Sequence, residues 1–274
     1  MKVVVADNAG FCFGVKRAIA LTHEVVKRKQ TVYSLGPLIH NPQVVEALRK
    51  EGVKVISKID GTEEGVVVIR SHGVPPQIVR KAREKGLEVV DATCPFVKET
   101  QNFVKMLGDE GYRVVIVGDK DHPEVKGLLG YAEKAVVVNG ADEAKKIRDK
   151  QIGVVSQTTQ STSKLTSVVD VLLKKVEELR IFNTVCSATA GRQESAKKLA
   201  KNVDVMVVVG GYNSGNTRRL YDICKAICSC CYHIERAEEI EKQWFKECKV
   251  VGVTAGASTP DYVIKEVCRT LGDM

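Results

Sequence analysis

The chain alternates short apolar runs, rich in valine and isoleucine, with longer segments in which apolar residues recur at helical spacing. Short apolar runs between helical segments are typical of strands buried on both faces of a parallel sheet. The pattern predicts strands at 2–6, 31–35, 53–56, 66–70, 88–91, 113–117, 135–138, 152–155, 182–185, 205–209, 231–235 and 249–253. It predicts helices that include 15–30, 42–51, 76–86, 97–110, 161–180, 191–201, 216–228, 236–247 and 260–271. This alternation predicts an α/β protein with mainly parallel sheets.

The same arrangement recurs three times along the chain. Strands 31–35, 113–117 and 205–209 each open a unit, and two strands of each unit end in polar loops. The first two units close with a strand that runs into a cysteine, in VVDATCP and NTVCSAT, whereas the third has its counterpart at the N-terminus, in VVVADNAGFCFG. We therefore expect three similar small α/β domains around a shared centre. Their predicted bounds are 13–95, 96–185, and 186–274 together with the N-terminal strand 1–12.

Cys12, Cys94 and Cys186 occupy equivalent places in this repeat, at separations of 94 − 12 = 82 and 186 − 94 = 92 residues. Each follows an apolar strand and precedes a helix. Ligands of open α/β sheets bind just beyond the carboxyl ends of the strands, so three converging ends would bring three thiolates to one point. Three thiolates with an open fourth position suit a [4Fe–4S] cluster with one reactive iron. A three-cysteine zinc site is the chemical alternative.

The other six cysteines have different surroundings. Cys224 lies among apolar helix positions and is expected in the core. Cys228 and Cys231 form a C-x-x-C pair with Cys230 between them, but they follow a helix, whereas a redox dithiol is expected to open one. We interpret this pair as incidental, with an accessory metal or a disulfide as the alternative. The remaining cysteines interpreted as packing residues are Cys248 and Cys268.

Composition narrows the class of protein further. Nine cysteines is an odd number, and the N-terminal residues lack the features of a signal peptide. We therefore expect a cytoplasmic protein in which surplus cysteines indicate metal or redox chemistry. The net charge of +8 suits an anionic substrate or an acidic partner, although a solvated surface would also explain it. With 5% aromatic residues, no nucleic-acid-binding motif and no apolar run of membrane-spanning length, we expect neither nucleic acid nor membrane as a partner.

Several loops that follow predicted strands carry residues suited to an anion. Three of the five histidines, His40, His72 and His122, lie in such loops, and imidazole can hold a diphosphate or move protons. The segment GGYNSGNTRR joins a strand to a helix, so its glycines and the helix N-terminus favour a phosphate group. Ordinary turn chemistry is the alternative. Further neutral donors at matching strand ends are Thr158, Ser214, Asn216 and Ser258.

Glu124 stands in the loop sequence D-H-P-E, directly beside a candidate histidine. A carboxyl group screened from water can stay protonated near neutral pH and act as a general acid. A first-turn glutamate favoured by the helix dipole explains the same position equally well. The residues alone leave these two interpretations open.

Eight segments, taken together, resemble one known family. They are GFCFGVKRAI, SHGVPP, DATCPFV, DHPEVKG, VSQTTQS, VCSATAGRQ, GGYNSGNTRRL and VTAGASTPD. In order and from the first strand to the last helix, they closely resemble the 4-hydroxy-3-methylbut-2-enyl diphosphate reductases, the last enzymes of the non-mevalonate route to isoprenoids. One departure is Gly215, where many relatives carry a second small hydroxyl residue.

The resemblance implies a pseudo-threefold arrangement of three α/β domains around one [4Fe–4S] cluster per chain. It implies that the cluster ligands are Cys12, Cys94 and Cys186. The implied diphosphate pocket consists of His40, His72, His122, Thr158, Ser214, Asn216 and Ser258. The implied catalytic residues are Glu124 as proton donor, Thr158, which orients the substrate's hydroxyl, and His122.

The implied reaction removes the C4 hydroxyl of (E)-4-hydroxy-3-methylbut-2-enyl diphosphate by two one-electron transfers and protonation. Its products are isopentenyl diphosphate and dimethylallyl diphosphate. The family's expected electron donor is a reduced ferredoxin or flavodoxin. The alternative from another class is a non-catalytic iron–sulfur sensor or scaffold, which would need the three cysteines but not Glu124.

Overall fold

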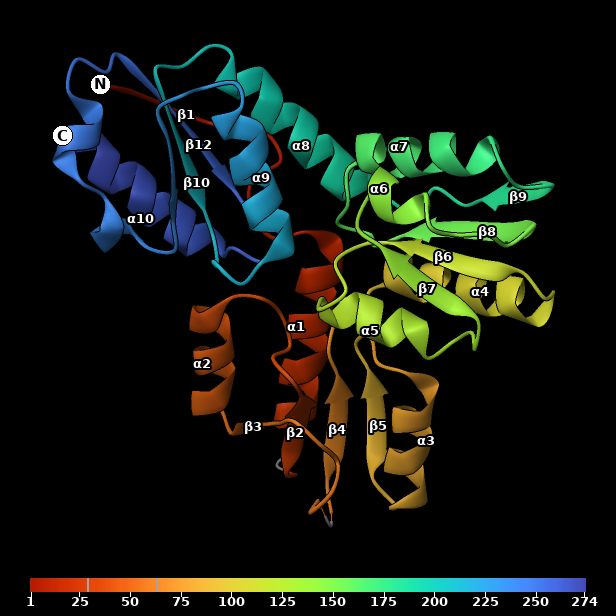
Figure 1. Cartoon of the computed structure of the whole chain (residues 1–274). Helices are drawn as coiled ribbons and strands as arrows, with labels where there is room; N and C mark the ends of the chain where they lie inside the picture. The colour runs from red at the N-terminus through yellow and green to blue at the C-terminus, as the bar shows by residue number, and fades with distance from the viewer. Residues whose placement is uncertain (29, 63) are drawn as a thin grey trace. The chain divides into compact units, whose positions relative to one another are not determined.

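The computed structural model describes residues 1–28, 30–62 and 64–274. Within these residues, twelve strands form three sheets, each of four parallel strands, and helices connect many of the strands (Figure 1). The predicted α/β class with parallel sheets is confirmed. Residue 29, the penultimate position of the predicted helix 15–30, lies outside the described residues.

The first sheet has the strand order β3–β2–β4–β5. Its strands are β2 (Val32–Leu35), β3 (Val53–Ile56), β4 (Val66–Ile69) and β5 (Glu88–Asp91). The helices in this part of the chain are α1 (Phe13–Val26), α2 (Pro42–Lys50) and α3 (Pro76–Glu84). The inner strand β4 reads VVVI and is buried throughout, as expected for a parallel strand covered on both faces.

The second sheet repeats this order as β7–β6–β8–β9. Its strands are β6 (Arg113–Val117), β7 (Ala135–Val138), β8 (Gln151–Ser156) and β9 (Glu178–Ile181). Its helices are α4 (Pro95–Asp109), α5 (Pro123–Leu129), α6 (Ala141–Ala144) and α7 (Thr162–Leu173).

The third sheet, β11–β10–β12–β1, repeats the order once more, with the N-terminal strand in the edge position. Strand β1 pairs with β12 from Lys2 opposite Val250 to Val5 opposite Val253. Its strands are β1 (Lys2–Val5), β10 (Val205–Val209), β11 (Cys231–Ile234) and β12 (Val250–Ala255). Its helices are α8 (Ser187–Ala200), α9 (Gly215–Lys225), α10 (Asp261–Gly272) and the 3₁₀ turns η1 (Ala237–Glu239) and η2 (Lys242–Phe245).

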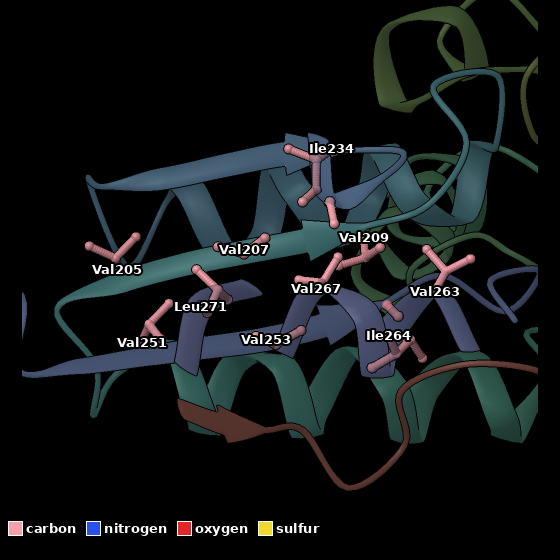
Figure 2. Packing of buried hydrophobic residues seen from close by; sticks show 12 residues of the cluster. Val205, Val207, Val209, Ile234, Val251, Val253, Val263, Ile264, Val267 and Leu271 are labelled. Atoms are coloured by element: carbon pink, nitrogen blue, oxygen red, sulfur yellow. The ribbon is translucent and has the colours of Figure 1, made fainter. Parts of the chain in front are cut away.

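The core of the third sheet shows how the valine runs are used. Side chains of a strand alternate between the two faces of its sheet. In β10 the side chains on both faces are buried. Val205, Val207 and Val209 pack with residues of α10, including Val267 and Leu271 (Figure 2). The alternate residues of β10 pack in a second cluster with α8 and α9; they are Met206 and Val208.

The chain divides into two compact units. The third-sheet unit comprises residues 1–15, 39–46 and 187–274, and the two-sheet unit comprises residues 16–38 and 47–186. The first and second sheets both belong to the two-sheet unit. The division into three domains at 95/96 and 185/186 stays a prediction.

Three predicted elements are wrong. The helix predicted over 161–180 ends at Leu173, and the chain then forms β9 at Glu178–Ile181 instead of a strand at 182–185. Strand β9 is an edge strand with exposed positions, so its sequence ELRI mixes polar and apolar residues. This mixed pattern was interpreted as a continuation of the preceding helix. The helix predicted over 236–247 is replaced by η1 and η2. Trp244 stacks on Tyr232 with ring centroids 4.1 Å apart, a tertiary contact that local periodicity does not reveal.

Candidate active site

The three cysteines singled out by the sequence occupy equivalent positions in the three sheets. Each follows the edge strand of its sheet, and its backbone N–H bonds to a carbonyl in the loop after the neighbouring strand. These bonds run from Cys12 to Ala257 (3.1 Å), from Cys94 to Ser71 (2.9 Å) and from Cys186 to Thr158 (2.9 Å). The local geometry therefore repeats three times, as the sequence pattern indicated.

Each of these cysteines also stands directly before a helix. Cys12 precedes α1, Cys94 is the N-cap of α4, and Cys186 precedes α8. All three are partly exposed. The amide groups at a helix N-terminus favour negative charge, so each position suits a thiolate ligand.

Glu124 is fully buried, and its carboxyl group is bonded to Thr158. Its Oε1 accepts a hydrogen bond from the Thr158 backbone N–H (2.6 Å), and its Oε2 accepts one from the Thr158 hydroxyl (2.8 Å). Burial raises the pKa of Glu124 to about 7, although the two bonds from Thr158 lower it. Of the two interpretations that the sequence left open, the screened carboxyl group describes this position better, since only 1% of Glu124 is exposed.

Two candidate histidines of the two-sheet unit, His122 and His72, lie in the same group of contacts as Glu124. His122 is the N-cap of α5, and its Nδ1 accepts the backbone N–H of Glu124 at 3.2 Å. The rings of His72 and His122 meet edge to face with centroids 5.5 Å apart. The fold thus brings His72, His122, Glu124 and Thr158 together from loops of the first and second sheets.

These contacts form a continuous series from one cysteine to another within the two-sheet unit. The series links backbone bonds, side-chain bonds, a ring contact and one step along the chain. In order, its members are Cys186, Thr158, Glu124, His122, His72, Ser71 and Cys94. Ser71, whose hydroxyl donates to the Leu38 carbonyl (3.1 Å), was not among the candidate residues predicted from the sequence.

The third-sheet unit contains the remaining candidates. Ser258 donates its hydroxyl to the His40 carbonyl (3.0 Å), and its neighbour Ala257 accepts the Cys12 N–H. Ser214 is the N-cap of α9, and its hydroxyl accepts the Thr217 N–H (3.3 Å). Because both serines already hold protein groups, they retain only part of their hydrogen-bonding capacity for a ligand.

Asn216 differs from both serines. It lies in the first turn of α9 and is 5% exposed. Within the described part of the chain, neither its Oδ1 nor its Nδ2 has a hydrogen-bond partner. A buried carboxamide without partners is costly unless a ligand completes it. Its position at the start of a helix suits an anion.

Arg192 is a residue that sequence reasoning missed. It is 4% exposed in α8 and donates to the carbonyl groups of Gly10 (2.8 Å) and Ala188 (3.2 Å). Its side chain therefore links the loop before Cys12 by a hydrogen bond to α8, the helix that follows Cys186. Arginine is almost never fully buried unless paired, but a sequence does not show which arginines are buried.

The remaining cysteines behave as expected or stay untested. Cys224 is fully buried in the core of the third-sheet unit, as predicted. Cys228 and Cys231 are buried in the same cluster.

In the described ranges, no helix is both long enough and apolar enough to cross a bilayer.

Comparison with known proteins assigns the chain to a family. A family model described as "LytB protein" matches residues 3–272. A relative from Geotalea uraniireducens, named 4-hydroxy-3-methylbut-2-enyl diphosphate reductase, is 52% identical over 273 residues, which cover 99% of this chain and 97% of the relative.

Two solved structures share the fold. One, of (E)-4-hydroxy-3-methyl-but-2-enyl diphosphate reductase, the terminal enzyme of the non-mevalonate pathway, is 48% identical, covers 100% of both chains and gives a TM-score of 0.73. The other, of E-1-hydroxy-2-methyl-but-2-enyl-4-diphosphate reductase from Plasmodium falciparum, is 28% identical, covers 99% of this chain and 87% of that one, and gives a TM-score of 0.92.

Fold and site together define an α/β enzyme with three parallel sheets and a buried carboxylic acid. The chain belongs to the LytB protein family, and the resemblance drawn from its sequence motifs is confirmed.

Proposed function

We propose that the chain removes the C4 hydroxyl group of (E)-4-hydroxy-3-methylbut-2-enyl diphosphate by reduction. The name shared by its relatives supports this substrate. The observation that carries the proposal is Glu124, a buried carboxyl group whose pKa is raised to about 7. A general acid works best when its pKa is close to the working pH, so Glu124 is suited to protonate a leaving hydroxyl group.

The proposed reaction balances with two electrons and two protons for each water released. The carbon–oxygen bond breaks, and a carbon–hydrogen bond forms at one of the two ends of the allylic fragment. The products are therefore isopentenyl diphosphate and dimethylallyl diphosphate. Glu124 gives the proton that leaves with the oxygen as water. The Thr158 hydroxyl, bonded to Glu124 Oε2 at 2.8 Å, orients the substrate's hydroxyl towards the acid, and His122 holds the Glu124 backbone.

We further propose that Cys12, Cys94 and Cys186 hold one [4Fe–4S] cluster. Three partly exposed thiols, each directly before a helix N-terminus, suit thiolate ligation of iron. When bound, the cluster would supply single electrons and a Lewis-acidic iron for the oxygen. The proposed electron donor is a reduced ferredoxin or flavodoxin, both of which are acidic and suit the net charge of +8. A cytoplasmic location stays a prediction.

The diphosphate is proposed to bind at the loops that follow the strands. The unpartnered carboxamide of Asn216 at the start of α9 supports this assignment. The other proposed contributors are His40, His72, His122, Thr158, Ser214 and Ser258. Bound there, the anion would meet imidazole, hydroxyl and amide donors, the groups that recognise phosphate oxygens without a Walker motif.

Anaerobic turnover tests the proposal. The protein would be reconstituted with iron and sulfide, reduced with dithionite through a viologen mediator, and given the hydroxylated diphosphate. We expect both five-carbon diphosphates as products. An iron–sulfur protein that binds the substrate but yields no product would instead support the non-catalytic alternative. A colourless protein with zinc and no acid-labile sulfide would contradict the cluster assignment.

A further inference from the structure

The edge strand β11 contacts the loop that joins β10 to α9, which contains residues 210–214. In β11, His233 lies opposite Val208, one residue before the strand's end. Glu235 follows two residues later, so both side chains project from the same face of the strand. This face is directed at the loop, and each of the two side chains bonds to its backbone.

Two backbone groups of the loop are held in this way. His233 Nε2 lies 2.8 Å from the Gly210 carbonyl oxygen, and Glu235 Oε1 accepts the Tyr212 N–H at 2.7 Å. The His233 ring packs between two tyrosines, with centroid distances of 4.7 Å to Tyr212 and 5.9 Å to Tyr221. The imidazole therefore has a fixed position between the loop and α9.

These contacts set the directions of the loop's amide groups. In a trans peptide the C=O and the following N–H point in opposite directions, so holding the Gly210 carbonyl fixes the Gly211 N–H. Likewise, Glu235 draws the Tyr212 N–H to one side and leaves the Gly211 carbonyl on the other. On that side the Gly211 carbonyl accepts a hydrogen bond from the Ser214 N–H (2.9 Å), and this bond closes the turn before α9.

The loop has little freedom to adopt another conformation at its start. Gly210 has φ +144, and a Cβ there would lie 2.6 Å from Thr259 Oγ1 and 2.9 Å from Thr217 Oγ1. The backbone is thus enclosed by threonines on one side, while His233 bonds its carbonyl. Since a carbonyl oxygen only accepts, Nε2 carries the proton. Burial lowers the pKa of His233, and the neutral ring with a proton on Nε2 still makes this bond.

We propose that His233 is a positioning residue for diphosphate binding: its bond to the Gly210 carbonyl holds loop 210–214 in the conformation that presents Ser214 and Asn216 at the start of α9. This inference rests on the proposed function of that loop. The observed contacts of His233 are with the loop backbone and two tyrosines, and it is not one of the proposed substrate-binding or catalytic residues. Its loss should therefore weaken binding while leaving the rate of the bound complex unchanged.

Two variants separate positioning from folding. His233→Leu removes the donor and keeps an apolar side chain, whereas His233→Gln keeps an N–H near the position of Nε2. We expect His233→Leu to weaken the binding of inorganic pyrophosphate about three- to tenfold, as for the loss of one hydrogen bond. We expect the affinity of His233→Gln for pyrophosphate to stay within about twofold of the wild-type affinity. His23→Leu, at a partly exposed histidine on α1, is the matched control.

Calorimetric titration with pyrophosphate gives the dissociation constants, and steady-state turnover gives kcat and KM separately. The inference predicts a raised KM and an unchanged kcat in His233→Leu, with recovery in His233→Gln. Wild-type affinity in His233→Leu, equal losses in both variants, or no pyrophosphate binding by the wild type would overturn it. A wild type that binds pyrophosphate but does not reduce the hydroxylated diphosphate would instead count against the proposed function.

Discussion

Glu124 and Glu143 occupy similar local positions but have opposite electrostatic properties. Each lies in the first turn of a helix that follows a strand of the second sheet. Glu124 is buried and its pKa is raised to about 7. Glu143 is partly exposed, and the Asn139 N–H and the neighbouring Lys120 hold its pKa below the usual value.

The difference comes from what covers each helix. Helix α5 lies against the backbone of Gly73 and Val74 at Gly127, and a Cβ at Gly130, just after the helix, would lie only 2.5 Å from the Pro75 Cβ. This close packing against a loop of the first sheet excludes water from Glu124. The short helix α6 leaves Glu143 open to solvent and to a lysine. Burial away from cations, and not the position in the helix, makes Glu124 an acid that can stay neutral.

The largest expected effect is on catalysis. Glu124→Gln should lower kcat by about 10²–10⁴-fold, the range for loss of a general acid. The kcat of Glu143→Gln should stay within about twofold of the wild-type value, because a substitution at a surface position has a small effect. Anaerobic turnover measures both, with iron and sulfide content as the control for cluster loading. Comparable activity in the two variants would remove Glu124 from the proposed mechanism.

The next effect is on stability. Because the pKa of folded Glu124 is raised from 4.5 to about 7, its ionisation opposes folding as the pH rises through this window. Above pH ~7, Glu124→Gln should therefore be more stable than the wild type by up to about 3 kcal/mol. The difference should vanish below pH ~4.5, where the carboxyl group is neutral in both states. Urea unfolding at several pH values measures it, and a pH-independent difference would contradict the assignment.

A smaller change is expected when Thr158 is replaced by valine. The side-chain bond from Thr158 lowers the pKa of Glu124, so Thr158→Val should raise that pKa further. In the wild type, kcat should decline as the pH rises past about 7, because the acid loses its proton. In Thr158→Val this decline should move to higher pH, while kcat at its maximum falls roughly tenfold as orientation of the hydroxyl is lost. A shift to lower pH would show that the bond acts in the opposite sense.

The smallest effect concerns the stability contribution of Glu143. Its pKa is lowered mainly by the hydrogen bond from the Asn139 N–H and also by Lys120, so the ionised carboxylate stabilises the fold above pH ~4.5, and this contribution is lost as the pH falls through the pKa of the folded state. Since Lys120 is exposed and Glu143 is partly exposed, Glu143→Gln should cost less than about 1 kcal/mol near pH 7. Its pH dependence should be opposite in sign to that of Glu124→Gln, and unfolding curves for the two variants test this.

Much of this arrangement is visible in the sequence. Valine runs such as that of β4 predicted the parallel strands, and the repeat predicted that the N-terminal strand belongs with the third unit, where it pairs with β12. The cysteines were located by their place in that repeat. The sequence could not decide between the two interpretations of Glu124, because burial of this residue accompanies the packing of α5 against residues 73–75, which are distant along the chain.

The residues that sequence reasoning missed have a common cause. Arg192 and His233 each bond to a backbone carbonyl group of a loop that is distant along the chain, at Gly10 and Gly210. A carbonyl group is present at every position, so no residue pattern marks the one that is bound. The edge strand β9 was misplaced for a related reason, since half-exposed strands lack a continuous apolar run.

The protonation of Glu124 near neutral pH is the claim on which the proposed mechanism depends most. Difference infrared spectroscopy of the wild type and Glu124→Gln, titrated across pH, observes this carboxyl group directly. We predict a protonated-carboxyl band, absent from the variant, that disappears with a midpoint at about pH 7. A midpoint near 4.5, the ordinary value for glutamate, would contradict the account.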